Sequence, residues 1–322
     1  MPMAKFIMKR LVYLVVVVLI ITLVTFVVFF AGNGTNLAAR FAGRAAGPLA
    51  IHAAYIRLGL EHGFWYQYWT YLDGLLHGSF GLDFQNQVPV TSEISRALPV
   101  TASLVVGGVV LWLIIGIPIG IMSAVHPRTI RDRLGTMFAL TFLSLPLFVL
   151  GVLSLLVFYF YLTKANIHWF PSGGYVGLSQ SPVQWFVHLL LPWFTLALAQ
   201  AAIYTRLIRS SLLETLGEDY IRTARAKGLS RWLVIYKHGL RAALTPVTTQ
   251  LGIDIGQLLA GAIVTERVFS LTGLGQLSLM SIYQGDLPVV AAVVLLAAVF
   301  IVVMNTLVDI LYAFLDPRVR LG

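Results

Sequence analysis

Residues 11–31, LVYLVVVVLIITLVTFVVFFA, contain no charged side chain, and this run decides the fold class of the chain. As an α-helix it would extend about 31 Å, which is the thickness of the hydrocarbon core of a bilayer. A cleaved signal peptide is the competing interpretation, but its apolar region is shorter, roughly 7 to 15 residues, and ends in a small-x-small site. The end of this run, Phe29-Phe30-Ala31, matches such a site poorly. We therefore predict that residues 11–31 form a first membrane span.

The composition of the whole chain agrees with a membrane protein. Of its 322 residues, 58% are hydrophobic and only 11% are charged, whereas a soluble domain carries about a quarter charged residues. The mean hydropathy is +0.86. These values exclude a soluble globular enzyme. The chain has no cysteine, which also excludes a disulfide framework, a thiolate metal site and a cysteine nucleophile.

Five further apolar stretches predict an all-α membrane protein with six transmembrane helices. They lie near residues 101–124, 136–162, 185–205, 246–266 and 288–311, of which 246–266 is the least hydrophobic. Because six spans make the connecting loops alternate between the two sides, the positions of Lys and Arg test the assignment. The N-terminus, the loops after the second and fourth spans and the C-terminal tail hold 16 of the 22 Lys and Arg residues. By the positive-inside rule both termini are cytoplasmic. The net charge of +9 is then mostly this bias, and we expect no nucleic-acid partner.

The spans divide the chain into three parts. Residues 1–31 form the cytoplasmic N-terminus and the first helix, 32–100 form a large extracytoplasmic segment, and 101–322 form a five-helix transmembrane core with a cytoplasmic loop at 206–245. The outer segment contains a cluster of aromatic residues of the kind that anchors a helix at the membrane surface. Its members are Trp65, Tyr66, Tyr68, Trp69 and Tyr71.

The inner loop predicts a helix, a break and a second helix. Residues 211–227 are rich in Leu, Glu, Arg and Ala, Gly228 is a typical helix stop, and Ser230 is a typical N-cap for a helix that begins at Arg231. Short charged helices of this kind can dock into a groove on another protein. They can also lie on anionic lipid. Composition alone leaves both roles open.

The spacing within this loop resembles a known family. Residues 219–230, DYIRTARAKGLS, and 238–246, HGLRAALTP, resemble the EAA loop of bacterial ABC-transporter importer permeases, in the dipeptide/oligopeptide/nickel branch and its first permease subunit. The loop departs from the general signature where Arg222 and Thr223 replace Glu and Ala, and where Arg241 replaces proline. Three other stretches are similar to the same family. They are GSFGLD at 78–83, ERVFS at 266–270 and LYAFLDPR at 311–318.

The resemblance implies a membrane-spanning permease subunit of an ATP-driven importer for di- or oligopeptides in the bacterial cytoplasmic membrane. Such a subunit forms the pathway with a second homologous permease, couples to two cytoplasmic ABC ATPase subunits and receives substrate from an extracytoplasmic binding protein. The chain has no Gly-x-x-x-x-Gly-Lys-[Ser/Thr] phosphate loop, so we expect ATP and Mg to be bound by the ATPases. We expect this chain to need no cofactor or metal and to be no enzyme itself. The residues we expect to couple it to the ATPases are Tyr220, Arg222, Ala224, Arg225, Lys227, Gly228 and Leu229.

Ionisable and polar residues inside spans are candidates for the translocation pathway. Asp254 and Asp309 lie in or near predicted spans, where an ionisable group is functional by default. Asp309 can instead reach the inner membrane surface or pair with Arg318, whereas Asp254 belongs to a polar stripe. The steps Gly116-x-x-x-Gly120 and Gly252-x-x-x-Gly256 allow close helix packing, including against a partner permease. The residues we expect to line the pathway are Ser144, Gln200, Gln250, Asp254 and Gln257.

Two other functions compete with the ABC importer. An ion-coupled secondary carrier would use Asp254 and Asp309, but such carriers usually contain an internal repeat, and none is clear in this sequence. An intramembrane enzyme would need a nucleophile–base pair or a metal constellation. The seven histidines lack the i, i+4 pairing of a zinc helix.

Overall fold

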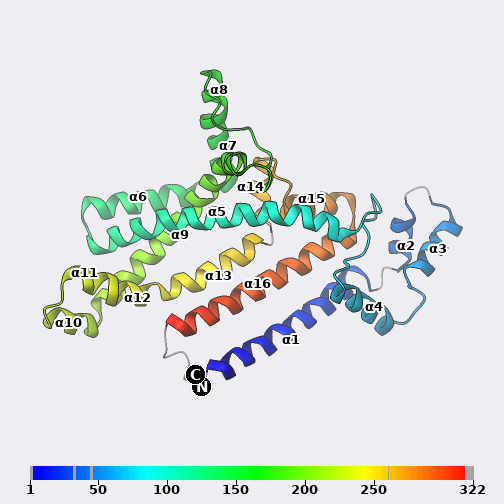
Figure 1. Cartoon of the computed structure of the whole chain (residues 1–322), viewed down its shortest axis with the longest axis horizontal. Helices are drawn as coiled ribbons and strands as arrows, with labels where there is room; N and C mark the ends of the chain where they lie inside the picture. The colour runs from blue at the N-terminus through cyan, green and yellow to red at the C-terminus, as the bar shows by residue number, and fades with distance from the viewer. Residues whose placement is uncertain (1–2, 32–33, 44–45, 260, 316–322) are drawn as a thin grey trace.

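The computed structural model describes residues 3–31, 34–43, 46–259 and 261–315, with the side chains of 3–7, 34–35 and 309–315 left out. Within these ranges the chain is helical and forms no strand beyond one isolated antiparallel bridge between Leu82 and Pro89. Long helices run side by side along the longest dimension of the molecule, with shorter helices at both ends (Figure 1). The predicted all-α class is confirmed.

Five helical stretches in the described chain are long and apolar enough to cross a membrane. Four of them cover the stretches predicted as the first, second, fourth and sixth spans. α5 and α9 are longer than expected, with 36 residues each. Each would therefore extend about 54 Å, well beyond a hydrocarbon core of about 30 Å. The helices are α1 (Met3–Phe29), α5 (Val90–Val125), the run from α7 to α8 (Leu147–Lys164), α9 (Pro182–Gly217) and α16 (Leu287–Leu315).

The prediction of one continuous span over residues 136–162 is wrong. α6 (Ile130–Ser144) ends before Leu145, whose backbone is extended at φ −90° and ψ 124°. The physical reason is Pro146, because a proline disfavours the helical conformation in the residue before it. A second run then begins; its first helix packs against α9, and its end at α8 projects away from the other helices (Figure 1). It consists of α7 (Leu147–Ser154), the π-helix η1 (Leu155–Tyr161) and α8 (Leu162–Lys164).

The predicted span at 246–266 is also divided. α13 (Thr245–Leu259) has 15 residues and would extend only about 22 Å, so it is too short to count as a span by itself. Gly261 follows in the left-handed region at φ +132°, and a Cβ atom there would lie 2.6 Å from the Cα of Gly275. The chain then forms the short helices α14 (Ile263–Val268) and α15 (Leu274–Gln284). A close backbone crossing that only glycine permits thus replaces the end of the predicted helix.

The two small-residue steps are used inside this chain. A Cβ atom on Gly120 would lie 2.9 Å from both the Cβ of Ile208 and the backbone oxygen of Thr205 in α9. Gly116 makes a similar approach to α9, while Gly252 and Gly256 approach α16. Glycine therefore brings α5 onto α9 and α13 onto α16. The possibility that these steps face a partner permease is thus replaced by contacts within the chain.

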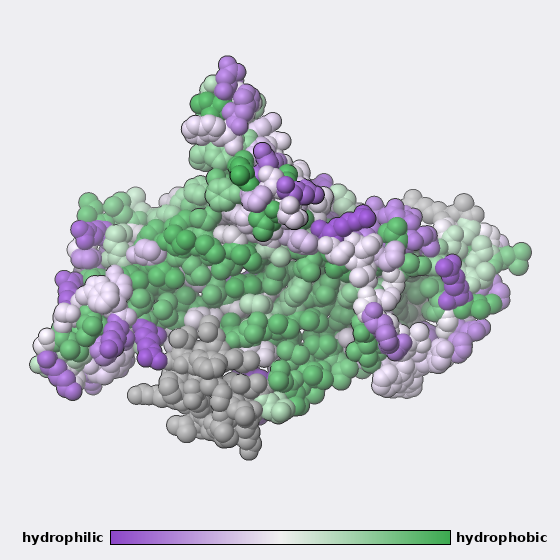
Figure 2. Space-filling model, in the orientation of Figure 1, coloured by the Kyte–Doolittle hydropathy of each residue, from purple (hydrophilic) through white to green (hydrophobic). Residues whose placement is uncertain are grey.

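The connecting segments gather at the two ends of the long helices. α2 (Gly34–Ala42), α3 (Pro48–Arg57) and α4 (Phe64–Leu76) lie at one end, and α10 (Asp219–Ala226), α11 (Arg231–Leu233), the π-helix η2 (Val234–Gly239) and α12 (Leu240–Ala243) lie at the other (Figure 1). Figure 2 shows hydrophobic surface along the helices and hydrophilic surface toward both ends. This is the distribution expected of a protein that crosses a bilayer between two aqueous phases.

The aromatic cluster of the outer segment lies on α4, as predicted, and α4 packs on α1. The Tyr68 hydroxyl lies 3.1 Å from the Thr22 hydroxyl, and the Tyr68 ring meets the Phe26 ring edge-on. Trp65 and Trp69 remain exposed on α4. Exposed tryptophans beside the end of a membrane helix are typical of the bilayer interface.

Candidate functional site

The candidate site is the helical turn that α10 forms at the end of α9. α9 ends at Gly217, and Glu218 turns the chain with an extended backbone at φ −67° and ψ 150°. α10 then runs for eight residues until Gly228, which adopts φ +74°. The Ser230 hydroxyl accepts a hydrogen bond from the Leu233 backbone at 3.4 Å and caps α11. The predicted stop at Gly228 and cap at Ser230 are confirmed, whereas the predicted helix 211–227 is broken at Gly217.

An apolar contact fixes α10 to the protein. Ile221 is fully buried and Ala224 is 8% exposed, and both pack with Val234 of η2 and Leu216 of α9. Residues three apart lie on one face of a helix, so α10 has an inner face and an outer face. Ala224, expected among the coupling residues, points inward. Ile221 was not predicted, although its i, i+3 spacing from Ala224 in a polar helix is a signal in the sequence.

The outer face of α10 is basic and exposed. Arg222, Arg225, Lys227 and Gly228 are all exposed. Arg222 forms an ion pair with Asp219 at 3.2 Å, but both side chains are largely in solvent, and such a pair stabilises little. Tyr220 is 45% exposed and Leu229 is 36% exposed beside these charges. Arginine with aromatic and apolar neighbours is the composition that favours protein–protein contact.

A cavity of about 400 Å³ lies directly beside this face. Arg225 and Leu229 line it from the α10 side, and Arg231 bonds across to the Val125 carbonyl at 3.1 Å. The hydrogen bond joins the loop to the C-terminal end of α5. The other lining residues are Val125, Leu216, Val234 and Ile235.

Two exposed aromatic residues next to the cavity were missed by the sequence analysis. Trp232 is 67% exposed and Tyr236 is 42% exposed, and their rings stack with centroids 5.1 Å apart. Their i, i+4 spacing on a helix places them on one face. That spacing, in a loop already known to be charged, is the signal that could have identified them.

An ion pair braces the helices above this site. Arg209 of α9 holds Asp132 at the start of α6 with two hydrogen bonds, Nε to Oδ1 at 2.6 Å and Nη2 to Oδ2 at 2.9 Å. The Asp132 side chain is 8% exposed. The hydrogen bonds from Arg209 hold the pKa of Asp132 below its usual range. A bidentate pair of this kind fixes orientation as well as distance.

The five residues expected to line a pathway do not form one group. Asp254 is 7% exposed and accepts hydrogen bonds of 2.8 Å from both the Tyr204 hydroxyl and the Gln250 amide. Gln257 is exposed on the same helix, α13. Ser144 lies at the end of α6, where it donates to the Leu140 carbonyl at 2.7 Å, and Gln200 is half-buried in α9. The Asp309 side chain lies outside the described residues.

These features define a multi-pass helical membrane protein with an exposed basic helix at one end. Residues 116–321 match the family described as "Binding-protein-dependent transport system inner membrane component", and residues 3–105 match the N-terminal family of the same system. The chain belongs to this family of inner-membrane transport components. It is therefore a permease component of a binding-protein-dependent ABC importer in the cytoplasmic membrane, and the sequence-based prediction of that function is confirmed.

Two named relatives cover most of the chain. It is 39% identical over 279 residues to the glutathione transport system permease protein GsiC of Pectobacterium atrosepticum, with 87% of each chain covered. It is 38% identical over 288 residues to the dipeptide transport system permease protein DppB of Escherichia coli strain K12, with 82% of this chain and 83% of the relative covered. Both names describe transport permeases.

A solved structure shares the fold. A chain of the MetNI methionine ABC transporter, in an inward-facing conformation, matches with a TM-score of 0.55 and 20% identity, covering 70% of this chain and 96% of that chain. The fold is thus that of an ABC transporter permease.

Proposed function

We propose that this chain is one of two permeases in an ABC importer for small peptides. The observation that supports the proposal most strongly is the exposed basic face of α10 on its buried anchor, Ile221. Relatives named for dipeptide and glutathione transport supply the substrate class, since both compounds are short peptides. In the complex we place six spans, with α6 and the run from α7 to α8 together as the third and α13 as the fifth. Both termini are on the cytoplasmic side.

The complex also needs subunits that bind ATP and deliver substrate. We propose a second homologous permease, two cytoplasmic ABC ATPases and an extracytoplasmic binding protein. ATP and Mg are bound by the ATPases, and this chain carries no cofactor and no catalytic residue. The division into residues 1–31, 32–100 and 101–322 assigns the outer segment to the binding-protein side and the loop 206–245 to the ATPase side.

The geometry suggests how movement is transmitted. An ATPase that moves α10 pulls on Ile221, which is packed against α9 and η2. α9 continues as one helix from Pro182 to Gly217, and Arg231 joins the loop to the end of α5 at 3.1 Å. A displacement of α10 therefore reaches two membrane helices through short contacts. Packed helices respond to such a displacement by sliding or tilting as units, which is what alternating access requires.

The pathway residues have a more limited role in this proposal. Gln257, exposed on α13, faces the space that the partner permease would close, and Ser144 and Gln200 add polar groups on neighbouring helices. Asp254 stands one helical turn from Gln257 but is held by Tyr204 and Gln250. We propose that Asp254 lines the pathway only as a positioning residue for α13.

Purification of the chain from its native membrane, with identification of the chains that co-purify, tests this proposal. We expect a second permease and phosphate-loop ATPases whose activity is blocked by vanadate. Replacing Arg222 or Arg225 with Glu should lower ATPase recovery and ATP-driven peptide uptake at least about tenfold. The matched control is Lys164→Glu, an exposed charge reversal on α8. Recovery of this chain without ATPases would contradict the proposal.

A bulky side chain at Gly228 tests whether this turn is part of the docking surface. A Cβ atom there would meet no other atom within 4 Å, so Gly228→Trp leaves the interior unchanged apart from backbone strain of about 1–2 kcal/mol. The indole would project from the proposed docking surface. We expect the variant to insert into the membrane but to lose its ATPases, and wild-type uptake by this variant would contradict the docking role of α10.

A further inference from the structure

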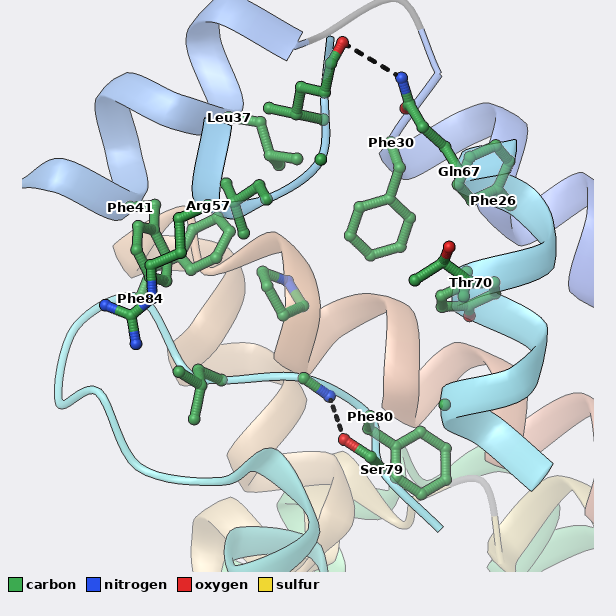
Figure 3. Close-up of a pocket in the computed structure, with 18 of the residues that line it drawn as sticks. Phe26, Phe30, Leu37, Phe41, Arg57, Gln67, Thr70, Ser79, Phe80 and Phe84 are labelled. Atoms are coloured by element: carbon green, nitrogen blue, oxygen red, sulfur yellow. Dashed lines mark hydrogen bonds between the residues drawn. The ribbon is translucent and has the colours of Figure 1, made fainter. Parts of the chain in front are cut away.

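A second cavity lies at the opposite end of the molecule from α10. Its volume is about 450 Å³, within the range of small-molecule sites. It is open on one side and is lined by the end of α1, by α2 to α4, by the loop at 79–84 and by Pro288 at the start of α16. Figure 3 shows Phe30 and Thr70 pointing into the space, with Phe41 and Arg57 on one side and Phe80 below.

In the orientation proposed above, the cavity lies at the level of the outer membrane surface. Phe26 and Phe30 come from the last turns of α1, whose candidate span ends at Phe29. α4 forms the opposite wall and presents the exposed Trp65 and Trp69, which are typical of that interface. The cavity therefore borders the zone where lipid headgroups meet acyl chains.

The lining is aromatic and apolar with one cationic group. Phe26, Phe30, Phe41, Phe80 and Phe84 contribute rings. The Arg57 guanidinium lies 5.4 Å from the centroid of the Phe41 ring. Among the described residues it has no acidic partner, in contrast to Arg209 and Arg222. An apolar chamber with an arginine held at its edge is complementary to a ligand with an apolar chain and an anionic end.

We propose that this cavity binds the acyl chain of an anionic amphiphile, with Arg57 holding its carboxylate or phosphate. The aromatic rings would surround the chain, and Thr70 would lie against it. Free fatty acid and anionic phospholipid share this chemistry, and an experiment can separate them. This site is separate from the proposed ATPase docking at α10, and a failure of one proposal leaves the other standing.

Photolabelling of the purified transporter complex tests the proposal. The complex is placed in phosphatidylcholine nanodiscs with a diazirine-bearing palmitate in one sample and a diazirine-bearing phosphatidylglycerol in another. After illumination, labelled peptides are mapped by mass spectrometry. We expect label in residues 26–41 or 79–84 in at least one sample. Label with palmitate alone identifies a fatty acid, and label with phosphatidylglycerol alone identifies a phospholipid.

Variants distinguish a built site from general contact with lipid. Arg57→Gln should lower labelling about tenfold, because a charge-assisted hydrogen bond is lost, while Arg57→Lys should keep part of it. Thr70→Trp should abolish labelling by filling the space. The matched controls are Arg96→Gln, an exposed arginine outside the cavity, and Leu76→Trp, whose position on α4 is 79% exposed and outside the lining. Both controls should label as wild type.

Three results would overturn the proposal. The first is labelling that is unchanged in both Arg57→Gln and Thr70→Trp. The second is label spread evenly along α1. The third is labelling displaced by the extracytoplasmic binding protein but not by unlabelled fatty acid or phospholipid, which would make the cavity a protein contact. Thermal unfolding of each variant shows whether it is folded. If Thr70→Trp is not folded, the partial labelling expected of Arg57→Lys still tests the site.

Discussion

The Tyr204 hydroxyl of α9 donates a hydrogen bond of 2.8 Å to Oδ2 of Asp254 in α13. Gln250 donates to the other carboxylate oxygen at the same distance. A carboxyl group inside a membrane protein is costly unless its oxygens are bonded, and here both oxygens are satisfied within the chain. The contact joins α9, which leads into α10, to α13, which contains the candidate pathway residue Gln257.

Tyr204→Phe should therefore destabilise the protein but leave its transport driven by ATP. Loss of the donor leaves one oxygen of Asp254 unsatisfied, and we expect the free energy of unfolding to fall by about 1–3 kcal/mol. Unfolding in a detergent titration measures this change.

Uptake by Asp254→Asn should still require ATP and persist when an ionophore collapses ion gradients. An ion-coupled carrier would instead lose uptake under the ionophore, in wild type as well.

A pH dependence is expected at the outer junction of Asp83 and Asp286. Asp286 is 1% exposed and accepts a hydrogen bond from the Phe84 backbone at 2.9 Å. Burial, together with the hydrogen bond to Asp83, raises the pKa of Asp286 to about 7. Burial also favours the neutral form of Asp83, but the hydrogen bonds from Asp286, Gln85 and Asn86 outweigh it and hold the pKa of Asp83 below its usual value.

The sign of the effect follows from proton binding. An unfolded Asp has a pKa of about 3.9, so between about pH 4 and about pH 7 the folded protein binds more protons at Asp286 than the unfolded chain. Stability should therefore fall as pH rises through this window, by about 1–3 kcal/mol. Thermal unfolding across the window measures the change. Asp286→Asn, which keeps an acceptor oxygen and does not titrate, should flatten the curve, and an equally steep curve in this variant would assign the effect to another group.

The packing of α5 on α9 should tolerate no added methyl group at Gly120. Its Cβ atom would lie 2.9 Å from a backbone oxygen that cannot move freely. We expect Gly120→Ala to reduce the free energy of unfolding by about 1–3 kcal/mol through overpacking. Gly63→Ala is the matched control, because a Cβ atom there meets no other atom within 4 Å. Equal stability of the two variants would show that the helices are less tightly packed than this geometry indicates.

The ion pair of Asp132 and Arg209 should stabilise the start of α6. Asp132→Asn removes the charge from a side chain that is 8% exposed and leaves Arg209, which is 33% exposed, partly hydrated. We expect a loss of about 1–3 kcal/mol in the free energy of unfolding. Hydrogen exchange should increase in α6 and remain unchanged in α4. Unchanged hydrogen exchange in α6 would show that the Asp132–Arg209 pair does not stabilise this helix.

The sequence predicted the parts of the fold that hydrophobicity alone controls. The run at 11–31 and the stretch at 288–311 are helical because a helix is the arrangement in which a single segment satisfies its own backbone hydrogen bonds in lipid. The break at Leu145 was missed because average hydropathy does not detect the effect of one proline, Pro146, on its neighbour. The crossing of Gly261 and Gly275 was missed for another reason, since it depends on two segments that meet only in the folded chain.

The candidate site was predicted in position but not in detail. The exposed residues of α10 and the turn at Gly228 followed from charge and spacing. Ala224, which we expect among the coupling residues, points inward, and the family pattern marks the residue without saying which way it points. Asp254 shows the same limit, because its partner Tyr204 lies 50 positions away in the chain, and no local pattern reveals such a contact.

Cross-linking from α10 tests whether this helix contacts an ATPase subunit. The chain contains no cysteine, so Arg222→Cys introduces a single thiol on the exposed face. A thiol-reactive photo-cross-linker attached there, in native membranes, should capture an ATPase subunit. The same probe at Ser179→Cys, an exposed position before α9, should capture none. A cross-link from residue 222 only to lipid, or to the extracytoplasmic binding protein, would contradict the assignment of α10 as the ATPase docking helix.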